Sequence, residues 1–242
     1  MSCALCNVHE HEIPVAEYIL MCILMLTTQV AQADHGLRQG RWRGSGRYDG
    51  AFHGELYGKT LGLIGFGHIG QAAAQRALAF GARVIAVRRN PRAHPDLDWC
   101  GPISDLPRLL DESDYVAVVC PLTPETRGLL GEPELRALRP EAILINAARA
   151  AIIDESALYR ALSERWFAGA AIDVWYQYPP DPEPGLGGSR FPFHELSNTI
   201  VTPHYSGWTE AMIRRRYQKI AENLDHLARG EPLERVVHLA PE

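Results

Sequence analysis

The chain has 242 residues, of which 46% are hydrophobic, enough for one large domain or one and a half ordinary ones with a sizeable core. Its net charge of −5 and pI near 6.1 argue against nucleic acid or an anionic membrane as a partner. The five cysteines are odd in number and scattered, which predicts a reducing, cytoplasmic location and no disulfide framework.

The N-terminal segment carries Cys3 and Cys6 as C-x-x-C, followed by His9 and His11. These are metal-ligand types, but a structural zinc site usually takes its two ligand pairs from well-separated segments. We therefore predict no metal site. The apolar run at residues 19–26 is far shorter than the roughly 18 residues a membrane span needs, so we expect no membrane contact.

Residues 13–38 predict one long helix. Pro14 suits the first turn of a helix, and Glu17 favours its positive N-terminus. Apolar side chains recur at helical spacing and define one face, so the helix should lie against a core or an interface. Residues 36–58 are rich in glycine and polar residues and predict an arm before the first strand.

The stretch at residues 59–81 organises the rest of the chain. Residues 60–64 are apolar and predict a buried parallel strand, and residues 71–80 predict a helix. Between them Gly65, Gly67 and Gly70 form G-x-G-x-x-G, the dinucleotide-binding fingerprint. The first glycine allows a tight turn, the second lets a diphosphate approach the backbone, and the third lets helix and strand pack closely. The alternative is a plain glycine turn.

Strand and helix patterns alternate along the rest of the chain, which predicts a parallel sheet. The fold class is therefore α/β, a Rossmann-like parallel sheet with helices on both faces, flanked by a long N-terminal helix and a C-terminal helix. We expect three parts: residues 1–38, residues 39–207 as the NAD(P)-binding domain, and residues 208–242. The expected strands are residues 83–87, 115–119, 142–146, 170–174 and 199–201; the expected helices are residues 106–112, 133–138, 155–164 and 209–229, and residues 179–192 are a loop.

Two arginines follow the second strand, at Arg88 and Arg89. A protein that binds NAD usually has an acidic residue near this point, which holds the ribose hydroxyls. A guanidinium matches a phosphate instead, so we predict NADP as the cofactor, with NAD as a possible substitute. The alternative is two ordinary exposed arginines on a loop.

Three further strand ends carry chemically capable side chains, which are Arg149, Asp173 and His204. Ligands of such sheets lie beyond the carboxyl ends of the strands, so these residues should converge on one crevice. Taken singly, each could be structural, as an ion-pair partner, a turn residue or a surface histidine. Their convergence beside the glycine turn favours a functional reading.

Six segments together resemble the D-isomer-specific 2-hydroxyacid dehydrogenases, from about residue 8 to residue 232: PVAEYIL, GKTLGLIGFGHIG, CPLTPETRGLL, INAARAAIIDE, AGAAIDV and TPHYSGWT. The resemblance implies that Arg149 binds the carboxylate and oxo group of the substrate and that His204 is the acid–base histidine. Together with the glycine fingerprint and the two arginines, the resemblance gives the expected cofactor contacts, which are Gly65, Phe66, Gly67, His68, Ile69, Gly70, Arg88, Arg89, Pro121, Thr126, Ala147, Ala148, Arg149, Asp173, His204 and Gly207.

The chain departs from the family pattern in three ways. It begins close to the end of the N-terminal substrate domain that the resemblance implies, so most of that domain is expected to be missing. Tyr178 stands where members carry a glutamate paired with the histidine, five residues after Asp173. Ala150 replaces a glycine. We predict Tyr178 as the partner of His204 and count it with the catalytic residues.

The resemblance implies an oxidoreductase that transfers hydride between NADPH and a small 2-oxo acid such as glyoxylate or hydroxypyruvate. The alternative is a truncated dinucleotide-binding module with weak or no turnover and a structural or regulatory role. A homodimer is also expected, because the family often pairs through this domain. We further expect Ile19, Ile23 and Leu26 of the first helix to be partly uncovered and to favour self-association.

Overall fold

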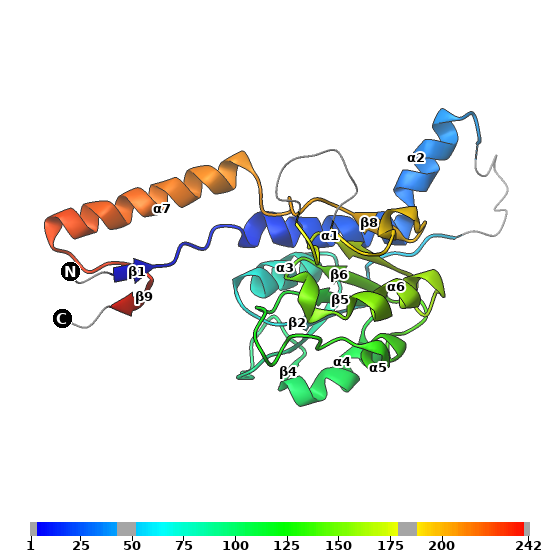
Figure 1. The fold of residues 1–242 in the computed structure, drawn as a ribbon, viewed down its shortest axis with the longest axis horizontal. Coiled ribbons are helices and arrows are strands. Elements are labelled where there is room, and N and C mark those ends of the chain that lie inside the picture. The colour runs from blue at the N-terminus through cyan, green and yellow to red at the C-terminus, as the bar shows by residue number, and fades with distance from the viewer. Residues whose placement is uncertain (1–3, 43–51, 179–187, 240–242) are drawn as a thin grey trace.

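The computed structural model describes residues 4–42, 52–178 and 188–239, which form a seven-stranded parallel sheet with helices on both faces (Figure 1). The strands lie in the order β4-β3-β2-β5-β6-β7-β8, so the chain leaves β2 toward one edge and later returns to fill the other. This confirms the predicted α/β fold class. The strands are β2 (Thr60–Ile64), β3 (Arg83–Val87), β4 (Trp99–Gly101), β5 (Tyr115–Val118), β6 (Ile143–Asn146), β7 (Gly169–Ile172) and β8 (Thr199–Val201).

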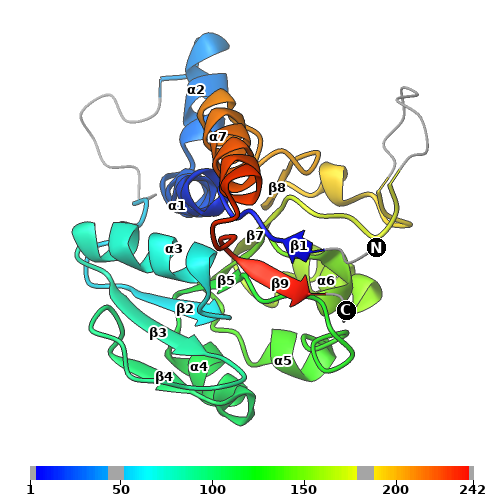
Figure 2. The same ribbon diagram turned by 90° about the vertical axis from the view of Figure 1, so that its left-hand side faces the viewer.

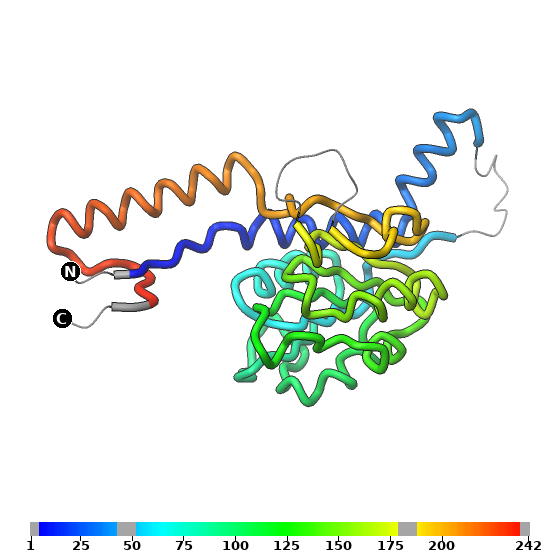
Figure 3. The backbone as a smooth tube through the Cα atoms, viewed as in Figure 1, coloured from blue at the N-terminus to red at the C-terminus, as the bar shows by residue number. Residues whose placement is uncertain are grey.

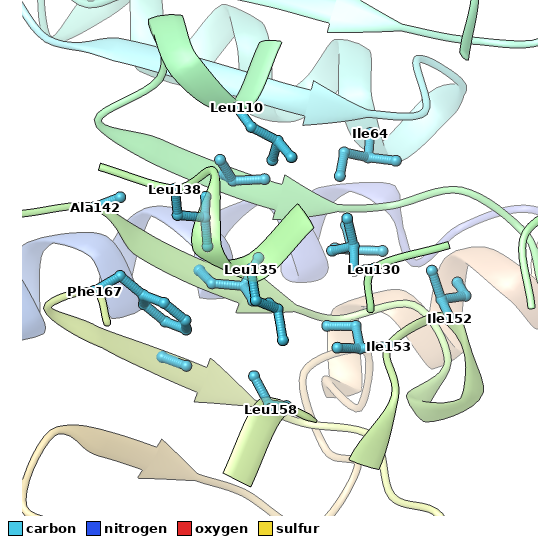
Figure 4. Packing of buried hydrophobic residues seen from close by; sticks show 14 of the residues in the cluster. Ile64, Leu110, Leu130, Leu135, Leu138, Ala142, Ile152, Ile153, Leu158 and Phe167 are labelled. Carbon is cyan, nitrogen blue, oxygen red and sulfur yellow. The ribbon is translucent and has the colours of Figure 1, made fainter. Parts of the chain in front are cut away.

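Two apolar layers enclose the sheet, which explains why β2, β5, β6 and β7 are buried along their whole length. On one face α1 (Glu12–Thr28) packs beside α3 (His68–Ala79). On the other face lie α4 (Leu106–Glu112), α5 (Glu132–Arg136) and α6 (Glu155–Ser163), as Figures 1 and 2 show. Figure 4 shows the second layer, in which Phe167, Leu135 and Leu158 fill the space under the sheet.

The predicted single N-terminal helix was wrong in one respect, because it breaks at Gln29. This residue has φ 54° and ψ 32°, in the left-handed region, and α2 (Val30–Arg38) leaves at an angle of 59° to α1. Beyond the break α2 carries no buried residue, so it does not continue the packing of α1 on the sheet. In the described part of the chain no single helix is long and apolar enough to cross a membrane, although this bent pair passes that test together.

The expected exposure of α1 was wrong for Ile19 and Ile23, which are 0% exposed. Leu26 packs against the same apolar layer and is partly exposed, as expected. The helix lies flat across the sheet beside α3, so its apolar face is already covered. The predicted arm and the predicted loop fall partly outside the described residues, at residues 43–51 and 179–187.

Three strands in the described residues were not predicted. The short strand β4 adds to the edge of the sheet, and β1 (Ala4–Cys6) pairs antiparallel with β9 (Val236–Leu239). The predicted last helix is confirmed as α7 (Glu210–Arg229), with the Thr209 hydroxyl accepting a hydrogen bond from Met212 N and Gly230 ending it at φ 70°. Figure 3 shows α7 extending away from the sheet, so that the two-stranded pair lies at the far end.

Candidate active site

The glycine turn after β2 is required by close packing at two of its three positions. Gly65 has φ 102°, and a Cβ there would lie 2.7 Å from the backbone nitrogen of Cys120. A Cβ on Gly70 would lie 2.9 Å from the Gly65 carbonyl oxygen. Gly67, in contrast, would have no atom within 4 Å of an added Cβ. The open space above Gly67, at the uncapped N-terminus of α3, fits a diphosphate.

A cavity of about 440 Å³ opens beside this turn, at the switch point between β2 and β5. Arg88 and Arg89 line it, and the Arg89 guanidinium lies 4.0 Å from the Glu125 carboxylate. A hydrogen bond from Thr123 lowers the pKa of Glu125. The other lining residues are Gly65, Phe66, Gly67, Val87, Asn90, Ile103, Val119, Cys120, Pro121, Thr123 and Thr126.

A second cavity, of about 460 Å³, continues from the first toward the end of β6. The two share lining residues, including Gly67, Cys120 and Pro121, so together they form one extended cleft. Burial raises the pKa of the Cys120 thiol to about 11, which keeps it protonated near neutral pH. The remaining residues that line the second cavity are His9, His11, Glu12, His68, Ile69, Val119, Leu122, Ala147, Ala148 and Arg149.

The last residue of β6 stabilises the turn that carries Arg149 by two hydrogen bonds. Asn146 is 2% exposed, and its amide oxygen accepts a hydrogen bond from Ala148 N at 3.2 Å. Its Nδ2 donates to the Arg149 carbonyl oxygen at 3.3 Å. The Arg149 side chain is exposed and donates to the Ala148 carbonyl oxygen at 2.6 Å. The backbone is thus fixed while the guanidinium remains at the mouth of the cleft.

Asp173 lies inside the protein and shapes the turn that carries His204. It is 0% exposed, and its Oδ1 accepts hydrogen bonds from the Thr202 hydroxyl at 2.7 Å and from Tyr205 N at 3.0 Å. Its Oδ2 accepts from Ser206 N at 3.1 Å. His204 has φ 55°, a backbone conformation that is costly for a residue with a side chain. Asp173 therefore stabilises the strained turn.

The His204 ring is in contact with the residue predicted to be its partner. The Tyr178 hydroxyl and His204 Nδ1 are 2.9 Å apart, and Trp175 N–H donates to the same hydroxyl oxygen at 3.2 Å. A Cβ on Gly207 would lie 3.4 Å from His11 Cβ, which brings this turn against the wall of the second cavity. His204, Tyr178, Asp173 and Gly207 are not among the residues that line either cavity.

The sequence had missed several residues that line the cleft. Val119 and Cys120 follow β5, so the strand-end rule could have identified them. His9, His11 and Glu12 reach the cleft through tertiary packing, which no local pattern signals. Within the described ranges, no group of three or more His, Cys, Asp or Glu side chains is suited to a metal ion; Cys3 lies outside those ranges.

The sheet order, the glycine turn and the cleft at the switch point define a dinucleotide-binding domain of the Rossmann type. Residues 20–206 match the model of the D-isomer specific 2-hydroxyacid dehydrogenase NAD binding domain. The chain therefore belongs to the D-isomer specific 2-hydroxyacid dehydrogenase family and carries its NAD-binding domain, which confirms the predicted resemblance.

Individual relatives agree with this assignment. A glyoxylate reductase of Korarchaeum cryptofilum is 34% identical over 216 residues, which cover 89% of this chain and 63% of the relative. A family protein of Aeromonas salmonicida has a TM-score of 0.83 at 28% identity, covering 97% of this chain and 71% of that one. An NADPH-dependent glyoxylate/hydroxypyruvate reductase of Sinorhizobium meliloti, solved with NADP and sulfate, has a TM-score of 0.79 at 26% identity. The match covers 96% of this chain and 70% of that one. The chain thus spans about 63% of the length of the first curated relative.

The glycine turn yields a prediction from two matched variants. Gly65→Ala should lower the free energy of unfolding by roughly 2–4 kcal/mol, since its Cβ meets the Cys120 backbone at a positive φ. Gly67→Ala should change that free energy by less than about 1 kcal/mol, yet weaken dinucleotide binding roughly tenfold or more. Denaturant unfolding and fluorescence titration with NADPH would measure both. Equal loss of stability in the two variants would contradict this assignment.

Proposed function

We propose that the chain is the dinucleotide-binding and catalytic part of an NADPH-dependent reductase of small 2-oxo acids, such as glyoxylate or hydroxypyruvate. The observation that carries the proposal is the contact of 2.9 Å between Tyr178 and His204, on a turn whose Gly207 packs against His11 in the wall of the cleft that runs from Arg88 to Arg149. A proton-transfer group next to a dinucleotide cleft suits reduction of a carbonyl. We also propose the division into residues 1–38, 39–207 and 208–242.

In this proposal each side chain has a separate task. Arg149 holds the substrate carboxylate and polarises the oxo group, since its guanidinium is exposed at the cleft mouth. The nicotinamide supplies the hydride chemistry when it is bound. Protonated His204 donates its Nε2 proton to the oxygen that becomes a hydroxyl, while Nδ1–H donates to the Tyr178 oxygen. The backbone at Ala147 and Ala148, together with Pro121 and Thr126, lines the cofactor side.

The runner-up function is a dinucleotide-binding module without turnover, acting in structure or regulation. The position of His204 and Tyr178, which line neither of the two cavities, supports it. Retention of Arg149 in the cleft wall and of the contact between Tyr178 and His204 supports the reductase instead. The four cysteines that the structure describes as free fit the proposed reducing, cytoplasmic compartment.

Turnover separates these two functions. The purified chain should oxidise NADPH in the presence of glyoxylate, hydroxypyruvate or another small 2-oxo acid. The rate is measured as the loss of NADPH absorbance. His204→Gln should lower the rate by roughly 100- to 10,000-fold, because the histidine supplies the proton. It should leave NADPH affinity within a few-fold, because His204 lines neither cavity. NADPH binding with no turnover of any acid in the panel would favour the runner-up.

The paired arginines predict cofactor preference. NADPH should bind roughly 10- to 100-fold more tightly than NADH, because the guanidinium groups match a 2′-phosphate. The double variant Arg88→Ala, Arg89→Ala should lose this preference for NADPH over NADH. Titration with each cofactor measures the two affinities. Arg92→Ala is the matched control, since Arg92 is exposed on the same loop and does not line the cleft. NADPH affinity that survives the double substitution would exclude this role.

The contact between Tyr178 and His204 predicts a pH effect. A tyrosine hydroxyl carries no charge near neutral pH, whereas a carboxylate stabilises the imidazolium beside it. Because reduction needs the protonated histidine, Tyr178→Glu should move the falling limb of the pH–rate profile up by about one pH unit. Tyr178→Phe should not move the falling limb of the pH–rate profile to higher pH. A limb that stays in place in Tyr178→Glu would mean that another acid is the partner; Glu183, the other candidate, lies outside the described residues.

We also propose a homodimer, in which α7 is part of the contact. Four side chains at helical spacing along α7 are exposed: Tyr217, Ile220, Leu224 and Leu227. Leu224→Glu should shift the chain toward the monomer in light scattering at micromolar concentration. Leu37→Glu is the matched control, since Leu37 is similarly exposed but lies on α2. A monomeric wild type would contradict the dimer.

A further inference from the structure

Three imidazoles gather where the cleft passes the start of α3. His9 and His11, from the segment before α1, line the same cavity as His68, the first residue of α3. The ring centroids of His9 and His68 are 5.0 Å apart, with an interplanar angle of 33°. The proposed reduction gives no task to His9 or His11.

Two helix N-termini open on this cavity. α1 begins at Glu12 with His11 as its N-cap, and α3 begins at His68 with Gly67 as its N-cap. The His11 side chain accepts no hydrogen bond from the first turn of α1, and Gly67 has no side chain that could cap α3. The free backbone N–H groups and the partial positive charge of each terminus favour an anion between them.

The segment that carries His9 and His11 is fixed by an ion-pair clamp. The Glu10 carboxylate, in a residue only 8% exposed, lies 3.3 Å from Arg215 Nε on α7 and 3.7 Å from Arg235 Nη1 before β9. Arg235 also donates to the His9 carbonyl oxygen at 3.0 Å, and Arg215 to the Glu10 carbonyl oxygen at 3.2 Å. The cavity wall is therefore held in place before any ligand arrives.

Charges around His9 disfavour its protonation in the free chain. Burial lowers the pKa of His9, and the neighbouring His68, Arg235 and His11 lower it further. The Glu12 carboxylate acts in the opposite direction from the same cavity, in which Arg149 adds another positive charge. A diphosphate in this cavity would reverse the balance, because its negative charge favours imidazolium.

We propose that His9, His11 and His68 enclose the diphosphate of a bound dinucleotide, and that this cluster takes up protons from solvent as the dinucleotide binds. The proposal rests on the proposed dinucleotide site and adds a second, N-terminal wall to it. Each imidazolium N–H donates a charge-assisted hydrogen bond to a phosphate oxygen. Since the complex holds more protons than its separated partners, affinity rises as pH falls.

Isothermal titration calorimetry with NADPH tests this directly. Titrations between pH 6 and 8, in two buffers that differ in ionisation enthalpy, give both affinity and protons taken up per NADPH. The wild type is compared with the double variant His9→Gln, His11→Gln, and His35→Gln on exposed α2 is the matched control. The comparison cancels the titration of the 2′-phosphate itself, which ionises near pH 6.

The wild type and the control should take up roughly one more proton per NADPH near neutral pH than the double variant. Their affinity should also rise roughly tenfold more than that of the variant between pH 8 and pH 6. Identical proton uptake in all three proteins would overturn the histidine cluster and leave the dinucleotide site intact. Absence of NADPH binding to the wild type would overturn both.

A second measurement needs no variant and covers the case in which the double variant does not fold. The ring proton resonances of His9 and His11 are titrated by NMR in the wild type, with and without saturating NADPH. Their midpoints should move to higher pH when NADPH is bound. Midpoints that do not move would overturn the proposal.

Discussion

The close approach of Gly65 to Cys120 is the constraint on which the site depends. At the carboxyl ends of β2 and β5 the chain turns away in opposite directions, and the two backbones are so close there that a Cβ on Gly65 would lie 2.7 Å from Cys120 N. The divergence leaves a cleft above the sheet edge, and the contact brings the end of β5 into its wall. The remaining strand ends then supply side chains to one edge, because every strand runs in the same direction.

A second network fixes the proton-transfer side of this edge. Buried Asp173 gathers hydrogen bonds from three residues of the turn that holds His204 in its left-handed conformation. The Tyr18 hydroxyl, from α1, lies 2.8 Å from the Thr202 hydroxyl in the same network. Helix α1 therefore covers the sheet and also supports the histidine turn, which couples the N-terminal helix to the candidate active site.

The sequence predicted the parts of the fold that rest on local patterns. Continuous apolar runs marked β2, β3, β5 and β6 to within about a residue, since buried parallel strands have little room for polar side chains. β4 was not predicted because three residues are too few to show a hydrophobic pattern. The helix break at Gln29 was not predicted because no glycine or proline marks it. The pairing of β1 with β9 joins opposite ends of the chain, and no local pattern encodes such a contact.

In the candidate site, too, the residues marked by a local pattern were predicted, and the contacts that depend on packing alone were not. Gly65, Arg88, Arg149 and His204 were predicted because each stands just after a strand in the sequence. The contact between Tyr178 and His204 was expected from the family pattern, and the two atoms lie 2.9 Å apart. Asp173 was predicted to hold the nicotinamide end, whereas its carboxylate accepts from the His204 turn inside the protein. Burial and hydrogen-bond partners of this kind depend on packing that the sequence does not state.

The most direct measurement of the central claim is the change in backbone amide NMR shifts when NADPH is added to the chain. The account predicts the largest changes at residues 65–69, 88–89, 119–120, 122 and 147–149, which line the cleft from end to end. A larger cavity, of about 620 Å³, lies between α5 and α6 and is lined by Gly131, Asp154 and Arg160 among others. Shift changes confined to the cavity between α5 and α6, or no change at saturating NADPH, would contradict the account.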